Sequence, residues 1–534
     1  MRRFPSGMPL PVLGGVLLLA AGLRLAHVGW GLPDYFFPDE AVFFRPATQV
    51  AATGNLRTGF TTYPPLSVNV LAATYAVAAR VRGVPVEQLS IAERVRLGRL
   101  AMVAAATATV AAVAVLGAEL AGPATGVTAA LFMAVLPVHV VQSRIISTDV
   151  LLTLFVVLVL WATLRLHARP TIARALACGA AVGLAAATKY PGALAAAAPA
   201  TVCLAGLAGG LRRHDAAASR LWIGCAAAAA LASVTAFTLA YPHWIAEADV
   251  LADRLRFLRF VAHEVGNDIA RLSPAGGIRG TPVVYQLAIL LPGALGLPLY
   301  ALAMAGIVRL AWRTTVREAA LLAFAAVHFA FFATAQSVFP RYYLPLTPVL
   351  LVAAAVLLTA LARRGDAART LALAAGGLAL AYTLALAVSL TAHTGTDPQR
   401  ALREAVQGLA ATQARPPRVG YVPDRFGDYT GVRAALRGLP VTPVQLLVDP
   451  TWLGEEKPDV LVVSDVDEVV AFRNYPQSTT ARTLRALAAG ELPYRLAADV
   501  RVDYLTRGLY TLLDPYFGFA VERGAVGFRV YARR

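Results

Sequence analysis

Eleven long apolar stretches constrain the fold of this chain more than any other feature of its sequence. A helix needs about 20 apolar residues to cross the hydrocarbon core of a bilayer. The stretches cover residues 8–30, 98–118, 122–141, 149–164, 175–188, 191–211, 221–242, 281–308, 319–338, 342–362 and 371–392. Only 15% of the 534 residues are charged, against about 25% in soluble domains. The sequence therefore predicts a mainly α-helical, polytopic membrane protein with about eleven spans.

The distribution of positive charge predicts the orientation of these spans. Of the net charge of +17, an excess of +15 lies before residue 393, beside the apolar stretches. Short cytoplasmic loops are enriched in Arg and Lys. Four loops fit this rule, carrying Arg165, Arg169 and Arg174; Arg212, Arg213 and Arg220; Arg309, Arg313 and Arg317; and Arg363, Arg364 and Arg369. All four are cytoplasmic if residues 66–79 lie along the membrane surface, which places Asp39, Asp149 and the C-terminal region outside.

A fifth group of arginines opposes this orientation, because it would lie outside: Arg80, Arg82, Arg94, Arg96 and Arg99. If residues 66–79 instead cross the membrane, these five arginines are cytoplasmic, and Asp149 and the later loops move to the opposite side of the membrane. Four loops outweigh one, so we expect a multi-pass protein of the inner (plasma) membrane. The basic charge indicates contact with membrane lipids and no nucleic acid, since no basic patch carries base-stacking aromatic residues.

The composition changes after residue 392. Charged residues become frequent, and short β-rich runs at 418–422, 459–463 and 528–531 alternate with helical patterns at 399–411 and 478–489, the second capped by Ser478 or Thr479. About 140 residues are enough for one domain. We therefore expect a transmembrane module over residues 1–392 and a soluble, extracytoplasmic α/β domain over residues 393–534.

Two adjacent carboxylates mark the first outside loop. Asp39 and Glu40 lie in the run Phe36-Phe37-Pro38-Asp39-Glu40-Ala41-Val42-Phe43-Phe44, at the edge of a span. Apolar surroundings raise the pKa of a carboxyl group and favour a role as general base. The alternative is a solvated acidic pair that only keeps the loop outside.

A third acidic residue, Asp149, stands at the start of an apolar span, after Ser143-Arg144-Ile145-Ile146-Ser147-Thr148. Ionisable groups at such positions are expensive and often functional. The alternative is structural, because an acidic group near a helix N-terminus suits the helix dipole. Both acidic sites fall on one membrane face, which favours a shared cavity.

Four motifs in order resemble those of known glycosyltransferases. The first loop resembles that of the protein O-mannosyltransferases, in which an Asp-Glu pair precedes a His-Pro-Pro-Leu element, and the aminoarabinose transferases of lipid A have a similar Pro-Asp-Glu. The corresponding residues are Asp39-Glu40 with Tyr63-Pro64-Pro65-Leu66, then Asp149, Thr188-Lys189-Tyr190 and Arg341-Tyr342-Tyr343-Leu344-Pro345. The chain thus resembles the GT-C fold glycosyltransferases, close to family 39 and the aminoarabinose-transferase-like group.

This resemblance implies a GT-C module that transfers a sugar, with inversion, from a polyprenyl-phosphate-linked donor to an acceptor hydroxyl on the outer face of the membrane. The acceptor, whether protein, lipid or cell-wall glycan, stays open. No cofactor is required, although some relatives outside this group use a divalent cation. In one respect the chain departs from the O-mannosyltransferases, since Tyr63 stands where they have His before Pro-Pro.

Such a reaction needs a carboxylate to activate the acceptor and cations to hold the leaving phosphate. We expect Asp39 to be the base, Glu40 to support it or bind substrate, and Asp149 to shape the sugar or acceptor pocket. Arg341, Lys189 and, more weakly, Arg144 are candidates for the phosphate, and Tyr63 and Tyr342 for a sugar face or prenyl chain. Membrane-border cations and interfacial aromatic residues are the alternatives for these groups.

Two further interpretations remain. The outside loop at 241–280 contains His243, Glu247, His263, Glu264 and Asp268, but their spacing is not the tight one of a metal site, and an interfacial helix that frames the active site is favoured. The rival function is a transporter or flippase of a lipid-linked sugar. Transporters typically carry internal repeats and acidic residues at mid-membrane, whereas here the acidic residues lie at span edges.

Overall fold

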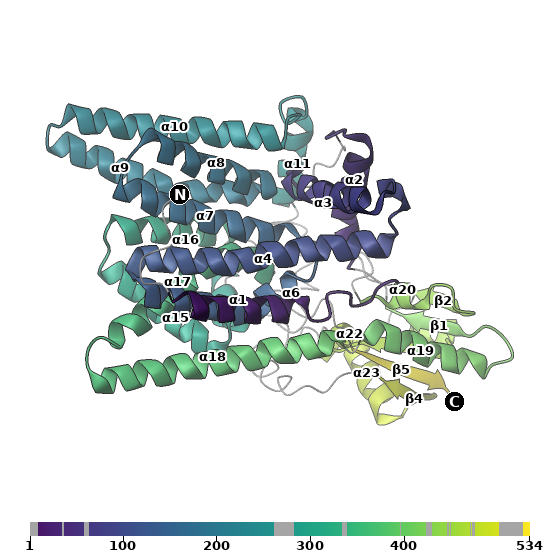
Figure 1. Ribbon diagram of the computed structural model, residues 1–534. Helices are drawn as coiled ribbons and strands as arrows, with labels where there is room; N and C mark the ends of the chain where they lie inside the picture. Colours follow the sequence, from purple (N-terminus) through teal and green to yellow (C-terminus); the bar gives the residue numbers. More distant parts are fainter. Residues whose placement is uncertain are drawn as a thin grey trace.

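The computed structural model describes residues 9–34, 37–57, 63–260, 282–333, 339–395, 397–422, 430–445, 448, 450–469, 471–472, 476–500 and 527–534. Helices dominate the first three quarters of the chain (Figure 1). They are α1 (Leu10–Leu25), α2 (Pro38–Thr53), α3 (Leu66–Arg82), η1 (Val86–Gln88), α4 (Ile91–Ala121), α5 (Pro123–Val135), α6 (Pro137–Gln142), α7 (Thr148–Ala168), α8 (Ile172–Thr188), η2 (Tyr190–Ala196), α9 (Ala197–Arg212), α10 (Ala216–Ala240), α11 (Ala248–Phe260), α13 (Pro282–Tyr285), η5 (Gln286–Leu290), α14 (Leu291–Leu295), α15 (Leu297–Trp312), α16 (Val316–Ala333), η6 (Pro340–Leu346), α17 (Thr347–Leu361) and α18 (Asp366–Gly395).

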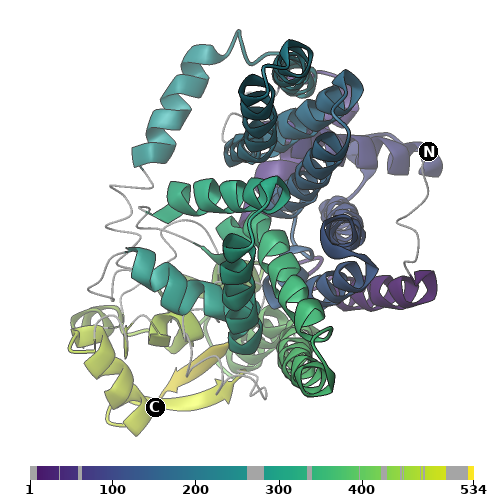
Figure 2. The same cartoon turned by 90° about the vertical axis from the view of Figure 1, so that its left-hand side faces the viewer.

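Within the described ranges, seven helical segments are long and apolar enough to cross a membrane, or eight if the sharply bent pair Gln286–Leu295 and Leu297–Trp312 is one span. Three shorter apolar helices, α1, α5 and α8, accompany them. The prediction of a mainly helical integral membrane protein is confirmed, while the exact number of eleven spans stays a prediction. Viewed from the end remote from the C-terminal sheet, the helices gather into a bundle (Figure 2).

Local sequence sets the ends of the long helix α4. Ser90 accepts a hydrogen bond from the backbone N–H of Glu93 at 3.2 Å, and the Glu93 carboxylate accepts one from the backbone N–H of Ser90 at 2.8 Å. This reciprocal cap satisfies backbone donors that have no partner inside the helix. At the other end Gly122, with φ of +101°, breaks the helix before Pro123 begins α5.

Two glycines bring α8 against α10. Gly179 and Gly183 are one turn apart on α8, and a Cβ at either would collide with the backbone of Ala229 or Ser233 on α10. Small residues at this spacing let membrane helices approach closely. The two helices are therefore in close contact from the middle of α8 onward, and α8 ends immediately before Lys189.

Helices α2 and α3 lie at the same end of the bundle as the C-terminal sheet (Figure 1). Helix α3 is not among the segments apolar enough to cross. The prediction that residues 66–79 lie along the membrane surface stays a prediction.

The C-terminal region carries a five-stranded sheet with the order β2-β1-β3-β5-β4. Strand β1 is parallel to β2 and β3, whereas β5 is antiparallel to β3 and β4. The elements are α19 (Pro398–Ala411), β1 (Arg418–Tyr421), α20 (Val432–Leu436), β2 (Thr442–Gln445), α21 (Pro450–Glu456), β3 (Val460–Ser464), α22 (Asp465–Val469), α23 (Thr479–Ala489), β4 (Tyr494–Asp499) and β5 (Phe528–Arg533). Leu402 and Val406 of α19 pack in one apolar cluster with the sheet, and Leu484 and Leu487 of α23 pack in another. The predicted α/β character is confirmed, and the division of the chain into domains at residue 392 stays a prediction.

The C-terminal region contacts the loop before α2. Asp397 accepts a hydrogen bond from the backbone N–H of Gly31 at 3.2 Å. Trp30 and Phe37 from this loop pack with Ile145 and with Ala434 of α20. The sheet region is thereby attached to the residues that flank Asp39.

Candidate active site

Glu40 lies in the first turn of α2 and is completely buried. It accepts hydrogen bonds from Arg99 Nε at 2.9 Å and Nη2 at 2.8 Å, from the backbone N–H of Phe37 at 2.8 Å and from that of Ile146 at 3.1 Å. A buried charge requires such partners, because desolvation of an unpaired ion is very costly. Glu40 therefore joins α2, α4 and the segment before α7, and both of its oxygens are occupied.

Asp39 is in a different environment from its neighbour. Its side chain is 31% exposed, and its Oδ2 lies 3.4 Å from a guanidinium nitrogen of Arg341, which belongs to η6. Asp39 lines a cavity of about 150 Å³ together with Tyr63, Asp149, Arg341 and Phe37. Of the two adjacent carboxylates, the accessible one is thus Asp39.

Asp149 and Lys189 form a second ion pair beside this cavity. Lys189 Nζ donates to Asp149 Oδ1 at 2.7 Å, and both side chains are almost fully buried. The ammonium also lies over aromatic rings, 4.7 Å from the ring centroid of Tyr342 and 5.7 Å from that of Tyr63, a favourable arrangement for a cation. Four segments far apart in the sequence therefore meet at this point: the start of α7, the end of α8, the segment before α3, and η6.

Tyr63 and Tyr342 form the aromatic wall of the site. The ring of Tyr63 stacks on Phe43 with 5.6 Å between centroids. Burial raises the pKa of the Tyr63 phenol, so this group stays protonated at neutral pH. Tyr342 stacks on Phe332 at 5.4 Å and lies 5.8 Å from the guanidinium carbon of Arg341.

The short helix η6 is held by residues that sequence reasoning does not single out. His328 Nε2 lies 2.9 Å from the carbonyl oxygen of Tyr342, which accepts the hydrogen bond. Tyr343 donates to Gln286 Oε1, and Gln286 Nε2 donates to the carbonyl of Phe332 at 2.9 Å. In the sequence, these residues could be recognised as polar groups within apolar helices. Burying a polar group in a membrane helix costs free energy, so such a group often has a structural or functional role.

Four of the eight predicted site residues line the cavity: Asp39, Tyr63, Asp149 and Arg341. Lys189 and Tyr342 lie against these residues, and Glu40 is the buried neighbour of Asp39. Arg144 is buried, its Nη1 donates to the carbonyl of Ala26 at 3.3 Å, and it does not line the cavity. Arg99, by contrast, is the partner of Glu40 and is not predicted as a site residue. Arg99 could have been recognised in the same way as Asp149, because it is a charged residue at the edge of an apolar stretch.

A metal centre is not formed by the residues that the structure describes, among which no group of three His, Cys, Asp or Glu side chains could hold an ion. His263, Glu264 and Asp268 lie outside the described ranges. Glu247 of the same loop accepts a hydrogen bond from Tyr241 at 2.6 Å and pairs with Arg57 at 3.3 Å.

Comparison with known proteins places part of the chain in a described family. The family model "Dolichyl-phosphate-mannose-protein mannosyltransferase" matches residues 91–238. No curated protein sequence matches the chain.

Solved structures are similar over most of the chain. The archaeal oligosaccharyltransferase AglB from Archaeoglobus fulgidus, in complex with an inhibitory peptide and a dolichol-phosphate, is 14% identical with a TM-score of 0.53, over 89% of this chain and 72% of that one. ArnT from Cupriavidus metallidurans is 16% identical with a TM-score of 0.48, over 98% of this chain and 97% of that one. The likeness to AglB confirms the predicted GT-C fold, and together with the family match it indicates a membrane glycosyltransferase.

Proposed function

We propose that this chain transfers a sugar from a polyprenyl-phosphate-linked donor to an acceptor hydroxyl, with inversion, in the cavity beside Asp39 and Asp149. The observation that carries the proposal is the juxtaposition of an accessible carboxylate with two cations. Asp39 is 31% exposed and 3.4 Å from Arg341, and Lys189 pairs with Asp149, which lines the same cavity. A base and a phosphate-binding pair are the two parts that the reaction requires.

The chemistry follows from these positions. Asp39 takes the proton of the acceptor hydroxyl as the acceptor oxygen attacks the anomeric carbon from the face opposite the phosphate. The bond between that carbon and the phosphate oxygen breaks, and its electron pair stays on the phosphate. Arg341 and Lys189 stabilise the negative charge of the leaving group. Attack from the opposite face inverts the anomeric configuration.

The other predicted residues have supporting roles in this scheme. Glu40 holds the first turn of α2 through Arg99, and so places Asp39. Asp149 orients the ammonium of Lys189. Tyr63 and Tyr342 offer flat apolar faces to the sugar or to the first isoprene units.

The nature of the donor is supported by the comparisons. The matching family model is described by a dolichyl-phosphate-linked sugar, and the AglB structure contains a dolichol-phosphate. A protein, a lipid or a cell-wall glycan each offers the hydroxyl that the scheme needs. We place the active site and the C-terminal sheet on the outer face of the inner membrane, because the arginine-rich loops then face the cytoplasm.

Replacing the base tests the proposal. Asp39→Asn keeps the shape of the side chain but removes its basicity, so we expect the transfer rate to fall about 10²- to 10⁴-fold. The measurement is transfer of radiolabelled sugar from a polyprenyl-phosphate donor by purified protein. Asp249→Asn, at an exposed position of α11, is the matched control and should retain full activity.

Two outcomes would count against the proposal. Normal transfer by a folded Asp39→Asn protein would exclude Asp39 as the base. Label that stays on the carrier but changes sides in sealed vesicles would favour the alternative, a flippase of a lipid-linked sugar.

A further inference from the structure

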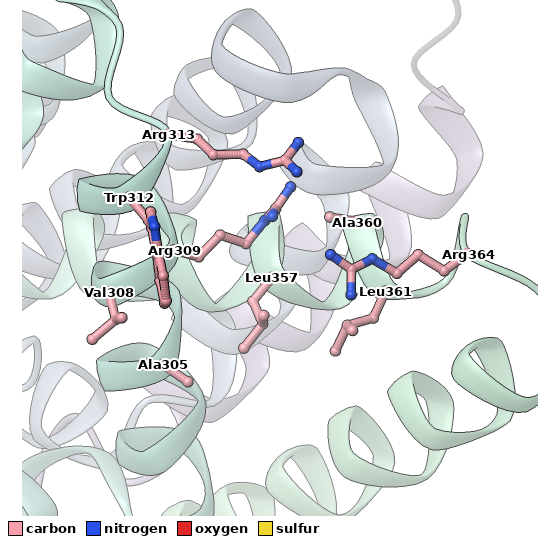
Figure 3. Close-up of a pocket in the computed structure, with 9 residues that line it drawn as sticks. All are labelled: Ala305, Val308, Arg309, Trp312, Arg313, Leu357, Ala360, Leu361 and Arg364. Carbon is pink, nitrogen blue, oxygen red and sulfur yellow. The ribbon is translucent and has the colours of Figure 1, made fainter.

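A second cavity lies between α15 and α17, at the end of the bundle remote from the sheet. Its volume is about 400 Å³, and three arginines line it: Arg309 and Arg313 at the end of α15, and Arg364 just after α17. Figure 3 shows their guanidinium groups turned toward one space, with Leu357 and Leu361 along its lower side. The catalytic scheme makes no use of these residues.

Among the described residues that line this cavity, no Asp or Glu balances the positive charge. Among the described residues, the three guanidinium groups have no ion pair, and Arg309 Nε is buried without a hydrogen-bond partner. Arg313 and Arg364 line the same cavity as Arg309, and the three guanidinium groups face one space. Like charges that converge in this way repel one another, and an anion bound between them removes that repulsion.

The outer rim of the cavity is apolar and accessible. Trp312 is 86% exposed and Val308 is 56% exposed, and both line the cavity beside the arginines. Tryptophan concentrates at the level of the lipid headgroups, where one side of the ring is apolar and the other is wet. The combination of an arginine cluster and an exposed apolar rim therefore fits a ligand with a charged head and an apolar tail.

The helices around the cavity are closely packed and connected to the active site. Gly306 of α15 lies against the backbone of Ala353 on α17, where a Cβ would collide. Helix α17 continues without a break from η6, which carries Arg341 and Tyr342. A ligand that joins α15 to α17 would stabilise the helix whose other end forms part of the active site.

We propose that this cavity binds the phosphate group of an anionic lipid headgroup. Arg309, Arg313 and Arg364 would share the phosphate oxygens through charge-assisted hydrogen bonds, and the acyl chains would lie along Val308 and Trp312. Basic pockets between transmembrane helices bind lipid headgroups in this manner. The site lies at the opposite end of the bundle from Asp39, so the lipid is not the sugar donor.

Thermal unfolding of the full-length protein in neutral detergent tests this proposal. Added phosphatidylglycerol should raise the unfolding midpoint in a saturable manner. Phosphatidylcholine, which carries a phosphate but no net charge, and inorganic phosphate, which has no chains, should have little effect. A response to inorganic phosphate as strong as that to phosphatidylglycerol would overturn the assignment to a lipid.

Matched double variants separate this site from general attraction to a basic surface. In R313Q/R364Q, both changes are at exposed cavity residues, and the phosphatidylglycerol concentration for half-maximal stabilisation should rise at least about tenfold. R363Q/R369Q removes the same charge from exposed positions near the cavity that do not line it, one just after α17 and one in the first turn of α18, and should respond like the unmodified protein. Equal loss in both variants, or no loss in R313Q/R364Q, would overturn the proposal.

Discussion

At the scale of residues, adjacent carboxylates in α2 have opposite environments. Glu40 is fully buried and accepts four hydrogen bonds, whereas Asp39 is 31% exposed and faces a cavity. Neighbouring positions of a helix point about 100° apart, so one side chain enters the protein while the next faces the cavity. Of these two neighbouring acidic residues, Glu40 therefore holds the structure together and Asp39 is the candidate base.

The ion pair between Glu40 and Arg99 predicts a stability effect. Glu40→Gln leaves the buried charge of Arg99 without compensation, and we expect a loss of about 3–5 kcal/mol in the free energy of unfolding. Arg99→Met should cost a similar amount for the converse reason. In the double variant no lone charge remains, so its loss should be well below the sum of the two single losses. Chemical denaturation of the three variants measures this cycle, and additive losses would contradict the pairing.

Lys189 predicts a kinetic effect. Lys189→Met removes a cation from the leaving phosphate, and we expect the kcat/KM for the lipid-linked donor to fall about 10²- to 10³-fold. The control is Lys457→Met, since Lys457 is the other lysine of the chain and is exposed in the C-terminal region. Steady-state kinetics with a varied donor concentration makes the comparison. Equal kcat/KM values for the two variants would argue that Lys189 has no role in catalysis.

At the scale of elements, helix packing places Lys189. Gly179→Val inserts a branched side chain where the backbone of α10 lies against α8, and overpacking of this kind costs about 1–3 kcal/mol. We expect a lower unfolding midpoint and a reduced transfer rate, because the end of α8 must move. Gly377→Val, in α18 where nothing lies within 4 Å of an added Cβ, is the control. A full transfer rate in the Gly179 variant would show that this packing does not position Lys189.

The strands of the C-terminal sheet differ in how well the sequence predicts them. Strands β1, β3 and β5 are apolar and buried, and their sequence pattern predicts them. Strands β2 and β4 are edge strands with mostly exposed residues, so no apolar alternation marks them. Ser478 caps α23 as expected, with its Oγ 3.1 Å from the backbone nitrogen of Ala481.

The sequence predicts which residues belong to the candidate site but not how they pair. The motifs identify Asp39, Asp149, Lys189 and Arg341 as site residues. Which of them form ion pairs depends on how helices distant in the sequence pack together. The partnership of Asp149 with Lys189 joins positions 40 residues apart. The burial of Arg144 away from the cavity depends equally on tertiary structure, which a single sequence does not contain.

At the scale of the whole molecule, the two ends of the bundle carry different chemistry (Figure 1). The candidate active site, α2, α3 and the sheet lie at one end, and the cavity of Arg309, Arg313 and Arg364 lies at the other. Helix α18, with 30 residues, is about 45 Å long and runs between the two ends. A helix of this length is about as long as a bilayer with its headgroups is thick.

The contacts of Glu40 have a consequence for the evolution of such chains. A substitution at position 40 or position 99 alone strands a buried charge, whereas a joint change to apolar residues does not. Related chains should therefore retain Glu and Arg together at these positions or lose them together. Asp39 has no such tie to Arg99, and as the proposed base it should be retained in active relatives whether positions 40 and 99 keep their ion pair or lose it together.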